Sequence, residues 1–374
     1  MKKLALFLGS LLVVGTAVQA KEIVAPVEVS KEVVVVAEPV VEEVIVTPAF
    51  KPTGYIGVEF RGYGKTEGHG DKQQGYDNAN GTVDPNVSQD EWNRGRNNYS
   101  RLETTFGVQA TENFSFEGRI RDFNSLEKND DSYVNKKDGT ETRLRAYYQH
   151  NEWFTSRVEY FDEVDNTQSL EYQARFTVYQ NKGALLSKLL LAPKFYHSFP
   201  SNGGSDYTNT LGMDIEYAGN LPLGFTWDGT IYLNQNFYGQ DYYTGVDKAT
   251  NTLTGSKDKE FTVNWELYLY RTFALYTTDN YGIDLNFEGG YDPYVFGQYD
   301  RYTKNDNDVV SKSDKDNYSL YAKFTLDGVY NVTESFSVNA GVGAEYRNWD
   351  NINQNSASDW RWQPFAFVGM KTVF

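Results

Sequence analysis

The feature that most constrains this chain is a two-residue alternation of apolar and polar side chains, which recurs from residue 54 to the end. In residues 99–110, Leu102, Phe106, Val108 and Ala110 share one face, whereas Arg101, Glu103, Thr105 and Gln109 share the other. Residues 114–121, 261–270 and 338–347 repeat the pattern. A period of two is that of a β-strand, because successive side chains of a strand point to opposite faces. The chain is therefore expected to be all-β.

Strand length and loop length separate a soluble sandwich from a membrane barrel. Many alternating runs last 9–12 residues, which is enough to cross a bilayer at a tilt. The connections 111–113, 151–152 and 331–334 are short, whereas 64–98, 125–141, 239–259 and 303–316 are long and polar. Short turns at one end and long loops at the other are typical of an outer-membrane β-barrel.

The polar face carries more charge than a packed core tolerates. A sandwich would bury a set of arginines at a cost of several kcal/mol for each unpaired one, and a water-filled lumen removes that cost. The set is Arg119, Arg121, Arg143, Arg145, Arg157 and Arg175.

The alternation predicts an antiparallel transmembrane β-barrel of about 14 strands, with 16 as the next choice. An even number of strands leaves both termini in the periplasm. The least regular region is 168–218, because residues 185–191 do not alternate cleanly. The expected strands are 54–63, 99–110, 114–124, 142–150, 153–162, 168–179, 188–199, 207–218, 225–238, 260–271, 281–292, 317–328, 335–348 and 360–374.

The two ends of the chain predict export and membrane assembly. Residues 1–20 combine two lysines, an apolar core and small residues, which indicates a cleaved signal peptide. Residues 21–52 form a Val/Glu/Pro-rich periplasmic segment, which can be a linker, a plug, a docking arm or an edge strand. The barrel is expected over 53–374. Its last strand ends at Phe374, which resembles the signal read by the outer-membrane assembly machinery; the alternative is an ordinary final strand.

Composition excludes several classes of function. After residue 20 no stretch approaches the roughly 20 apolar residues of a membrane helix. A net charge of −16 argues against nucleic acid as a partner. The chain has no cysteine, and its histidines (His69, His150 and His197) form no metal or catalytic motif. We therefore expect no enzyme activity, no catalytic residues, no cofactor and no metal.

Two walls of opposite charge are expected in the lumen. The basic wall consists of Arg101, Arg119, Arg121, Arg143, Arg145, Arg157 and Arg175, interspersed with Glu103, Glu117, Glu159 and Glu171. The acidic wall consists of Asp214, Glu216, Asp228, Glu266, Asp284 and Glu288, with no basic residue expected opposite them. Such walls create a transverse field across a pore. The alternative is that these charges only pair with neighbours along the wall.

Aromatic residues near strand ends predict the girdles of a membrane barrel. They are Tyr147, Tyr148, Trp153, Phe154, Trp360 and Trp362. The alternative role for aromatic residues is a sugar-stacking track inside the lumen. The residues on the inward register are Phe161, Tyr232, Tyr268, Tyr270 and Tyr321.

Several segments resemble one known family. "GGYDPYVFGQYDR" (Gly289–Arg301), "AGVGAEYRN" (Ala340–Asn348), "RWQPFAFVGMKTVF" (Arg361–Phe374) and the leader (Met1–Glu22) are similar to FomA-type major outer-membrane porins of fusobacteria. The likeness is strongest at the leader and over the last ninety or so residues. It implies a trimeric, voltage-gated, general-diffusion porin that is also a surface adhesin, and it carries over no individual site residue.

We therefore expect an integral outer-membrane porin, a water-filled channel for ions and small hydrophilic solutes. The alternative is a substrate-selective outer-membrane channel. The expected partners are outer-membrane lipid, two further copies of the chain in a homotrimer, the assembly machinery, and host or bacterial surface ligands of the extracellular loops.

Overall fold

The computed structural model describes residues 50–67, 73–77, 82–89, 98–126, 138–164, 167–200, 204–247, 249–304, 310–313, 319–351 and 354–374. The predicted signal peptide and nearly all of the segment 21–52 lie outside the described residues. Within them, no helix is long and apolar enough to span a membrane.

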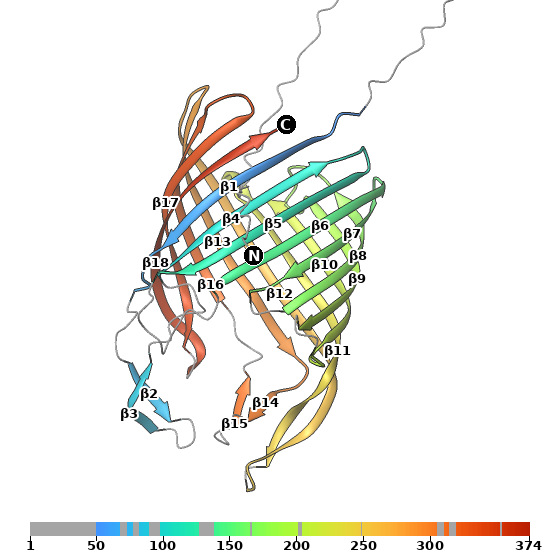
Figure 1. Ribbon diagram of the computed structural model, residues 1–374, viewed down its shortest axis with the longest axis vertical. Coiled ribbons are helices and arrows are strands. Elements are labelled where there is room, and N and C mark those ends of the chain that lie inside the picture. The colour runs from blue at the N-terminus through green and yellow to red at the C-terminus, as the bar shows by residue number, and fades with distance from the viewer. Residues whose placement is uncertain are drawn as a thin grey trace, which may run out of the picture.

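Fourteen strands form one closed antiparallel barrel (Figure 1). Each strand pairs with the next barrel strand along the chain, and β1 pairs with β18 to close the ring. The all-β fold and the count of fourteen are therefore confirmed. The strands are β1 (Thr53–Tyr63), β4 (Tyr99–Gln109), β5 (Phe114–Ser125), β6 (Gly139–Asn151), β7 (Phe154–Asp162), β8 (Thr167–Gln180), β9 (Lys188–Pro200), β10 (Thr208–Asn220), β11 (Thr226–Asp247), β12 (Thr252–Thr277), β13 (Tyr281–Gly297), β16 (Ser319–Asn331), β17 (Phe336–Asn351) and β18 (Gln354–Val373).

Strand β18 shows how the alternation sorts the two faces of the barrel. Gln363, Phe365 and Phe367 are buried, whereas their neighbours Trp362, Val368 and Met370 are exposed. The exposed set continues the apolar face expected from Ala366 to Phe374. Because side chains on the concave side of a closed sheet crowd one another, the buried set faces inward and the exposed apolar set faces outward.

The two ends of the barrel differ in the length of their connections. At the end that holds the C-terminus, the turn hydroxyls of Thr111 and Thr333 accept hydrogen bonds from backbone N–H groups two or three residues later. The opposite end carries β2 (Gln73–Asp77), β3 (Thr82–Gln89), β14 (Arg301–Lys304), β15 (Val310–Ser313) and the tip of the β11–β12 hairpin (Figure 1). Short turns and long connections thus lie at opposite ends.

The prediction of a loop over residues 239–259 is wrong for most of that range. Strands β11 and β12 continue to Asp247 and from Thr252, and Tyr243 to Asp247 pair with Thr252 to Ser256. This extension projects beyond the barrel, so water reaches both of its faces and no apolar face is needed. Without that face the sequence has no alternation to mark the strands.

Phe374 allows the assembly signal to be tested apart from barrel closure. Its backbone exchanges two hydrogen bonds with Gly54, of 2.8 and 2.9 Å, while the residue as a whole is 59% exposed. The substitution Phe374→Ala keeps both backbone bonds and removes only the ring. We expect a several-fold lower amount of folded protein in cell membranes, with unchanged refolding in detergent. The measurement is the gel mobility of unboiled against boiled protein, because a closed sheet has no edge from which to unravel.

Phe374→Trp is the matched control, because it keeps a terminal aromatic ring. Equal membrane levels of Phe374→Ala, Phe374→Trp and the parent chain would contradict the proposed signal.

Candidate functional site

The inner face of β1 and β4 carries carboxylates that are shared between arginines. The Glu59 side chain lies 2.8 Å from Arg61 and 3.0 Å from Arg101. Glu103 lies 3.3 Å from Arg101 and 2.5 Å from Arg121, and its side chain is fully buried. Since a buried carboxylate is tolerated only with charged partners, these pairs also fix the rotamers of the arginines.

The ion pairs continue across β5, β6 and β7. Arg119 donates to Glu141 over 2.8 Å. Arg145 donates to Glu159 and lies 3.3 Å from Glu117. One strand further, Arg157 donates to Glu171 on β8. The contacts from β1 to β8 therefore form one belt of alternating charge along the inner face.

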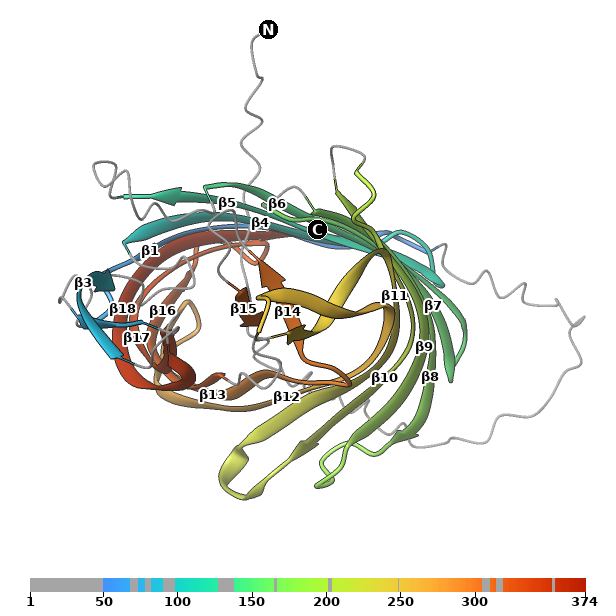
Figure 2. The same cartoon turned by 90° about the horizontal axis from the view of Figure 1, so that it is seen from below.

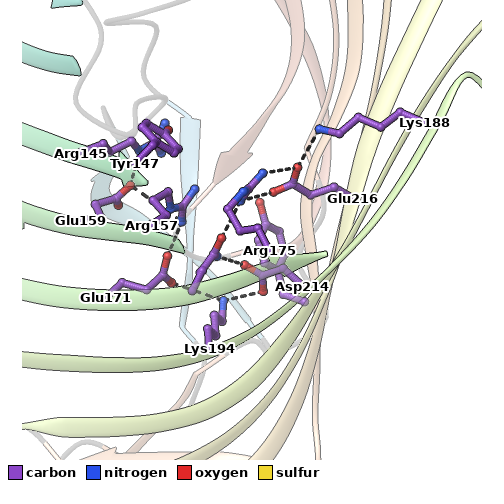
Figure 3. Close-up of polar contacts among 12 residues, drawn as sticks. Arg145, Tyr147, Arg157, Glu159, Glu171, Arg175, Lys188, Lys194, Asp214 and Glu216 are labelled. Atoms are coloured by element: carbon purple, nitrogen blue, oxygen red, sulfur yellow. Dashed lines mark hydrogen bonds and ion pairs between the residues drawn. The ribbon is translucent and has the colours of Figure 1, made fainter. Parts of the chain in front are cut away.

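The belt reaches β10 through Arg175 of β8 and through two lysines of β9 (Figure 3). Lys194 Nζ lies 2.6 Å from Asp214, and Gln173 donates to the same carboxylate over 2.6 Å. Glu216 pairs with Arg175 over 2.7 Å and with Lys188 over 3.2 Å.

The expectation that no basic residue opposes Asp214 and Glu216 is therefore wrong. Lys188 and Lys194 were not predicted to line the lumen, because residues 185–191 lack a clean alternation and the inner face of β9 could not be assigned from the sequence. The hydrogen-bonded register reveals that face, since it sets Lys194 directly opposite Gly212 on β10 and Gln173 on β8.

The opposite wall, on β11 to β13 and β16, combines carboxylates with tyrosines. Glu266 accepts hydrogen bonds from Tyr232 over 2.5 Å and from Tyr268 over 3.1 Å. Glu288 accepts from Tyr321 over 2.7 Å and lies 2.5 Å from Lys323. The expectation that no basic residue lies opposite Glu288 is therefore also wrong.

Within the described residues three members of the acidic set, Asp228, Glu266 and Asp284, form no ion pair. Glu266 accepts two tyrosine hydrogen bonds, whereas Asp228 and Asp284 have no such side-chain partner among those residues. Asp228 lies opposite Tyr268, and Asp284 lies opposite another carboxylate, Asp327. They are the members of the acidic set whose charge is compensated least.

All the residues assigned to the two walls share the inner face with these contacts, opposite the exposed apolar face. The ion pairs correspond to the alternative in which charges pair along the wall.

The aromatic residues expected in girdles divide between the two faces. Trp153, Tyr148 and Trp362 are exposed on the outside. The ring of Tyr346 is stacked on that of Trp360, with centroids 5.0 Å apart, and lies 4.7 Å from that of Trp362. Tyr147 instead faces inward and donates to Glu117 over 2.8 Å. Its assignment to a girdle is wrong, because adjacent residues of one strand cannot share a face.

Arg301 anchors the connection after β13 to the rim of the barrel. Its guanidinium donates to Glu260 over 2.7 and 3.2 Å and lies 4.5 and 4.4 Å from the ring centroids of Tyr238 and Tyr242. Figure 2 shows β14 and β15 within the outline of the ring of strands. This cluster, which the sequence reading did not single out, therefore holds part of the connection across one mouth of the barrel.

Comparison with known proteins finds no matching family model and no matching curated protein. Among solved structures, the chain is similar to a "bacterial polysaccharide outer membrane secretin", with 10% identity, a TM-score of 0.37, and coverage of 86% of this chain and 98% of the other. It is also similar to OprD from Pseudomonas aeruginosa (8% identity, TM-score 0.35, 86% and 94% covered) and to the channel DcaP of Acinetobacter baumannii (10% identity, TM-score 0.34, 87% and 96% covered). The function proposed below depends on this chain's own residues.

Glu103 tests whether the ion-pair belt stabilises the barrel. Glu103→Gln keeps the shape of the side chain but leaves Arg101 and Arg121 without one shared carboxylate. Removing one partner of a buried pair costs about 3–5 kcal/mol. We expect a lower temperature for the change in gel mobility of the refolded protein in detergent.

Glu112→Gln, in an exposed turn, is the control and should leave that temperature unchanged. If both variants lose their folded mobility at the same temperature as the parent chain, the belt does not stabilise the barrel.

Proposed function

We propose that this protein is an outer-membrane channel through which ions and small hydrophilic solutes diffuse passively. The observation that carries this proposal is a single closed sheet with an apolar outer face and a charged inner face. In lipid every backbone polar group must be bonded within the protein, and a closed barrel achieves this with strands. Large apolar side chains stand exposed on the outside of successive strands, among them Leu144, Val158, Leu170, Leu211, Val342 and Val368.

The inner face supports a water-filled interior. Arg143 and Arg145 keep 28% and 27% of their side-chain surface accessible, although each belongs to the ion-pair belt. Charged groups retain their hydration only where water reaches them. The residues of both walls are accordingly proposed to line the pore.

The resemblance to fusobacterial porins adds narrower predictions. They are voltage gating, assembly as a homotrimer, insertion by the outer-membrane assembly machinery, and adhesion to host or bacterial surface ligands through the long connections. The exposed apolar outer face suits contact with lipid or with another copy of the chain.

A substrate-selective channel is the second candidate, and one observation favours it. The ring of Tyr268 lies 6.4 Å from those of Tyr270 and Tyr321, on the inner face beside Glu266. Tyr321 is itself buried, with Arg347 over its ring, so Tyr268 and Tyr270 are the neighbouring inward rings on which a sugar can stack.

Conductance of the purified, refolded chain in planar bilayers tests the proposal. We expect discrete ohmic steps whose size grows with KCl concentration and which maltose does not block. Concentration-dependent block by maltose would favour the selective channel instead. An absence of steps, with boiled protein as the baseline, would overturn both candidates.

The ion preference of the channel, measured as a reversal potential, tests whether the acidic wall faces the ion path. The double variant Asp228→Asn and Asp284→Asn removes two carboxylates without breaking an ion pair, so the reversal potential in a KCl gradient should shift toward anion preference. The shift should shrink in high salt, because the Debye length falls from about 10 Å at 0.1 M to about 3 Å at 1 M.

Asp279→Asn, in an exposed turn, is the matched control and should leave the reversal potential unchanged. If the double variant behaves like this control, Asp228 and Asp284 do not face the ion path.

A further inference from the structure

The hydrogen-bonded register of β4 to β7 arranges the inner-face side chains in rows that cross the strands. One row runs Glu103, Arg121, Glu141, and another runs Glu117, Arg145, Glu159, so that opposite charges are neighbours in both. The row between them runs Thr105, Arg119, Arg143, Phe161. Two arginines therefore face each other in this row with no carboxylate beside them.

Like charges directly opposite each other destabilise a sheet unless something compensates them. The pair Arg61 and Arg101 is also directly opposite, but Glu59 lies within 3.0 Å of both guanidinium groups. No single carboxylate plays that part for Arg119 and Arg143. Arg119 has Glu141 at 2.8 Å, whereas the nearest carboxylate contact of Arg143 is Glu159 at 3.8 Å.

Arg143 is the arginine of this belt with the weakest pairing. Glu159 accepts a hydrogen bond from Arg145 and also lies 4.0 Å from Arg157, so three arginines share one carboxylate. The Arg143 guanidinium also lies over the ring of Phe161, 4.6 Å from its centroid. The Nε atoms of Arg119 and Arg143 are both buried without a hydrogen-bond partner. A guanidinium carries five N–H donors, so donors remain available here.

A cavity of about 140 Å³ lies at this row. It is lined by Tyr55, Thr105, Glu117, Gly118, Arg119, Arg143 and Arg145. The volume holds several water molecules and therefore also an oxyanion such as phosphate or a carboxylate group. Three of the lining side chains are cationic and one is anionic.

We propose that this cavity is an oxyanion-binding site on the inner wall, which takes the phosphate or carboxylate group of a small solute. Arg119 and Arg143 supply planar N–H donors to its oxygens, and Arg145 adds positive charge. An anion between the two opposed guanidinium groups replaces their repulsion by two attractions. The inference rests on the proposed function, because the solute reaches the cavity through the water-filled lumen.

Titration of refolded protein in detergent with inorganic phosphate, followed by calorimetry, tests the site without any membrane. The parent chain should bind phosphate, and Arg143→Gln should bind about tenfold or more weakly, as expected for losing a hydrogen bond from a charged group. Arg143→Lys keeps the charge and the fold but lacks the planar fork, so its affinity should fall between the two. Arg271→Gln, outside the cavity, removes an equal charge and should bind like the parent.

Two results would overturn the site: no phosphate binding by the folded parent chain, or equal affinity in the parent, Arg143→Lys and Arg143→Gln. If Arg143→Gln does not fold, as judged by gel mobility, the comparison of Arg143→Lys with the parent decides alone. Conductance is measured on the same preparations. A conducting parent that binds no phosphate rejects only the site, whereas phosphate binding without conductance rejects only the channel.

Discussion

Closure of the sheet is the constraint on which the rest of this molecule depends. Once β1 pairs with β18, every barrel strand has a partner on both sides, and no row of backbone N–H and C=O groups remains open. Closure also assigns the alternating side chains of each strand to two different faces, one inside the barrel and one outside it. Side chains of one parity crowd together on the concave face, and those of the other parity stand exposed on the convex face.

Most charged side chains of the inner face pair with neighbours on the same or an adjacent strand. From Glu59 on β1 to Glu216 on β10, most carboxylates lie within 4 Å of an arginine or lysine of the same or an adjacent strand. Such pairing costs little where water still reaches the groups, and it holds long side chains against the wall. Two features of the inner face depart from this pattern. Arg119 and Arg143 lie directly opposite each other, and within the described residues Asp228 and Asp284 form no ion pair.

The connections at the two ends of the barrel are held in different ways. At the end that holds the C-terminus, short turns are stabilised by their own side chains, as in the hydrogen bonds to Thr111 and Thr333. At the other end, strands β11 and β12 extend beyond the ring, and Arg301 is held between two tyrosine rings and Glu260. A cation stacked on two aromatic faces and paired with a buried carboxylate is a specific anchor. It places part of the connection after β13 over the opening.

The sequence by itself determined the all-β class, a count of about fourteen strands with sixteen as the alternative, and the outward face of the last strand, because a two-residue period is a local property of each segment. It did not determine which charges meet. That Lys194 pairs with Asp214, and that Arg119 faces Arg143, depends on the stagger between neighbouring strands, which closure of the whole barrel sets. The face of β9 and the extension of β11 and β12 were likewise decided by pairing partners, because neither segment carries a clean apolar alternation of its own.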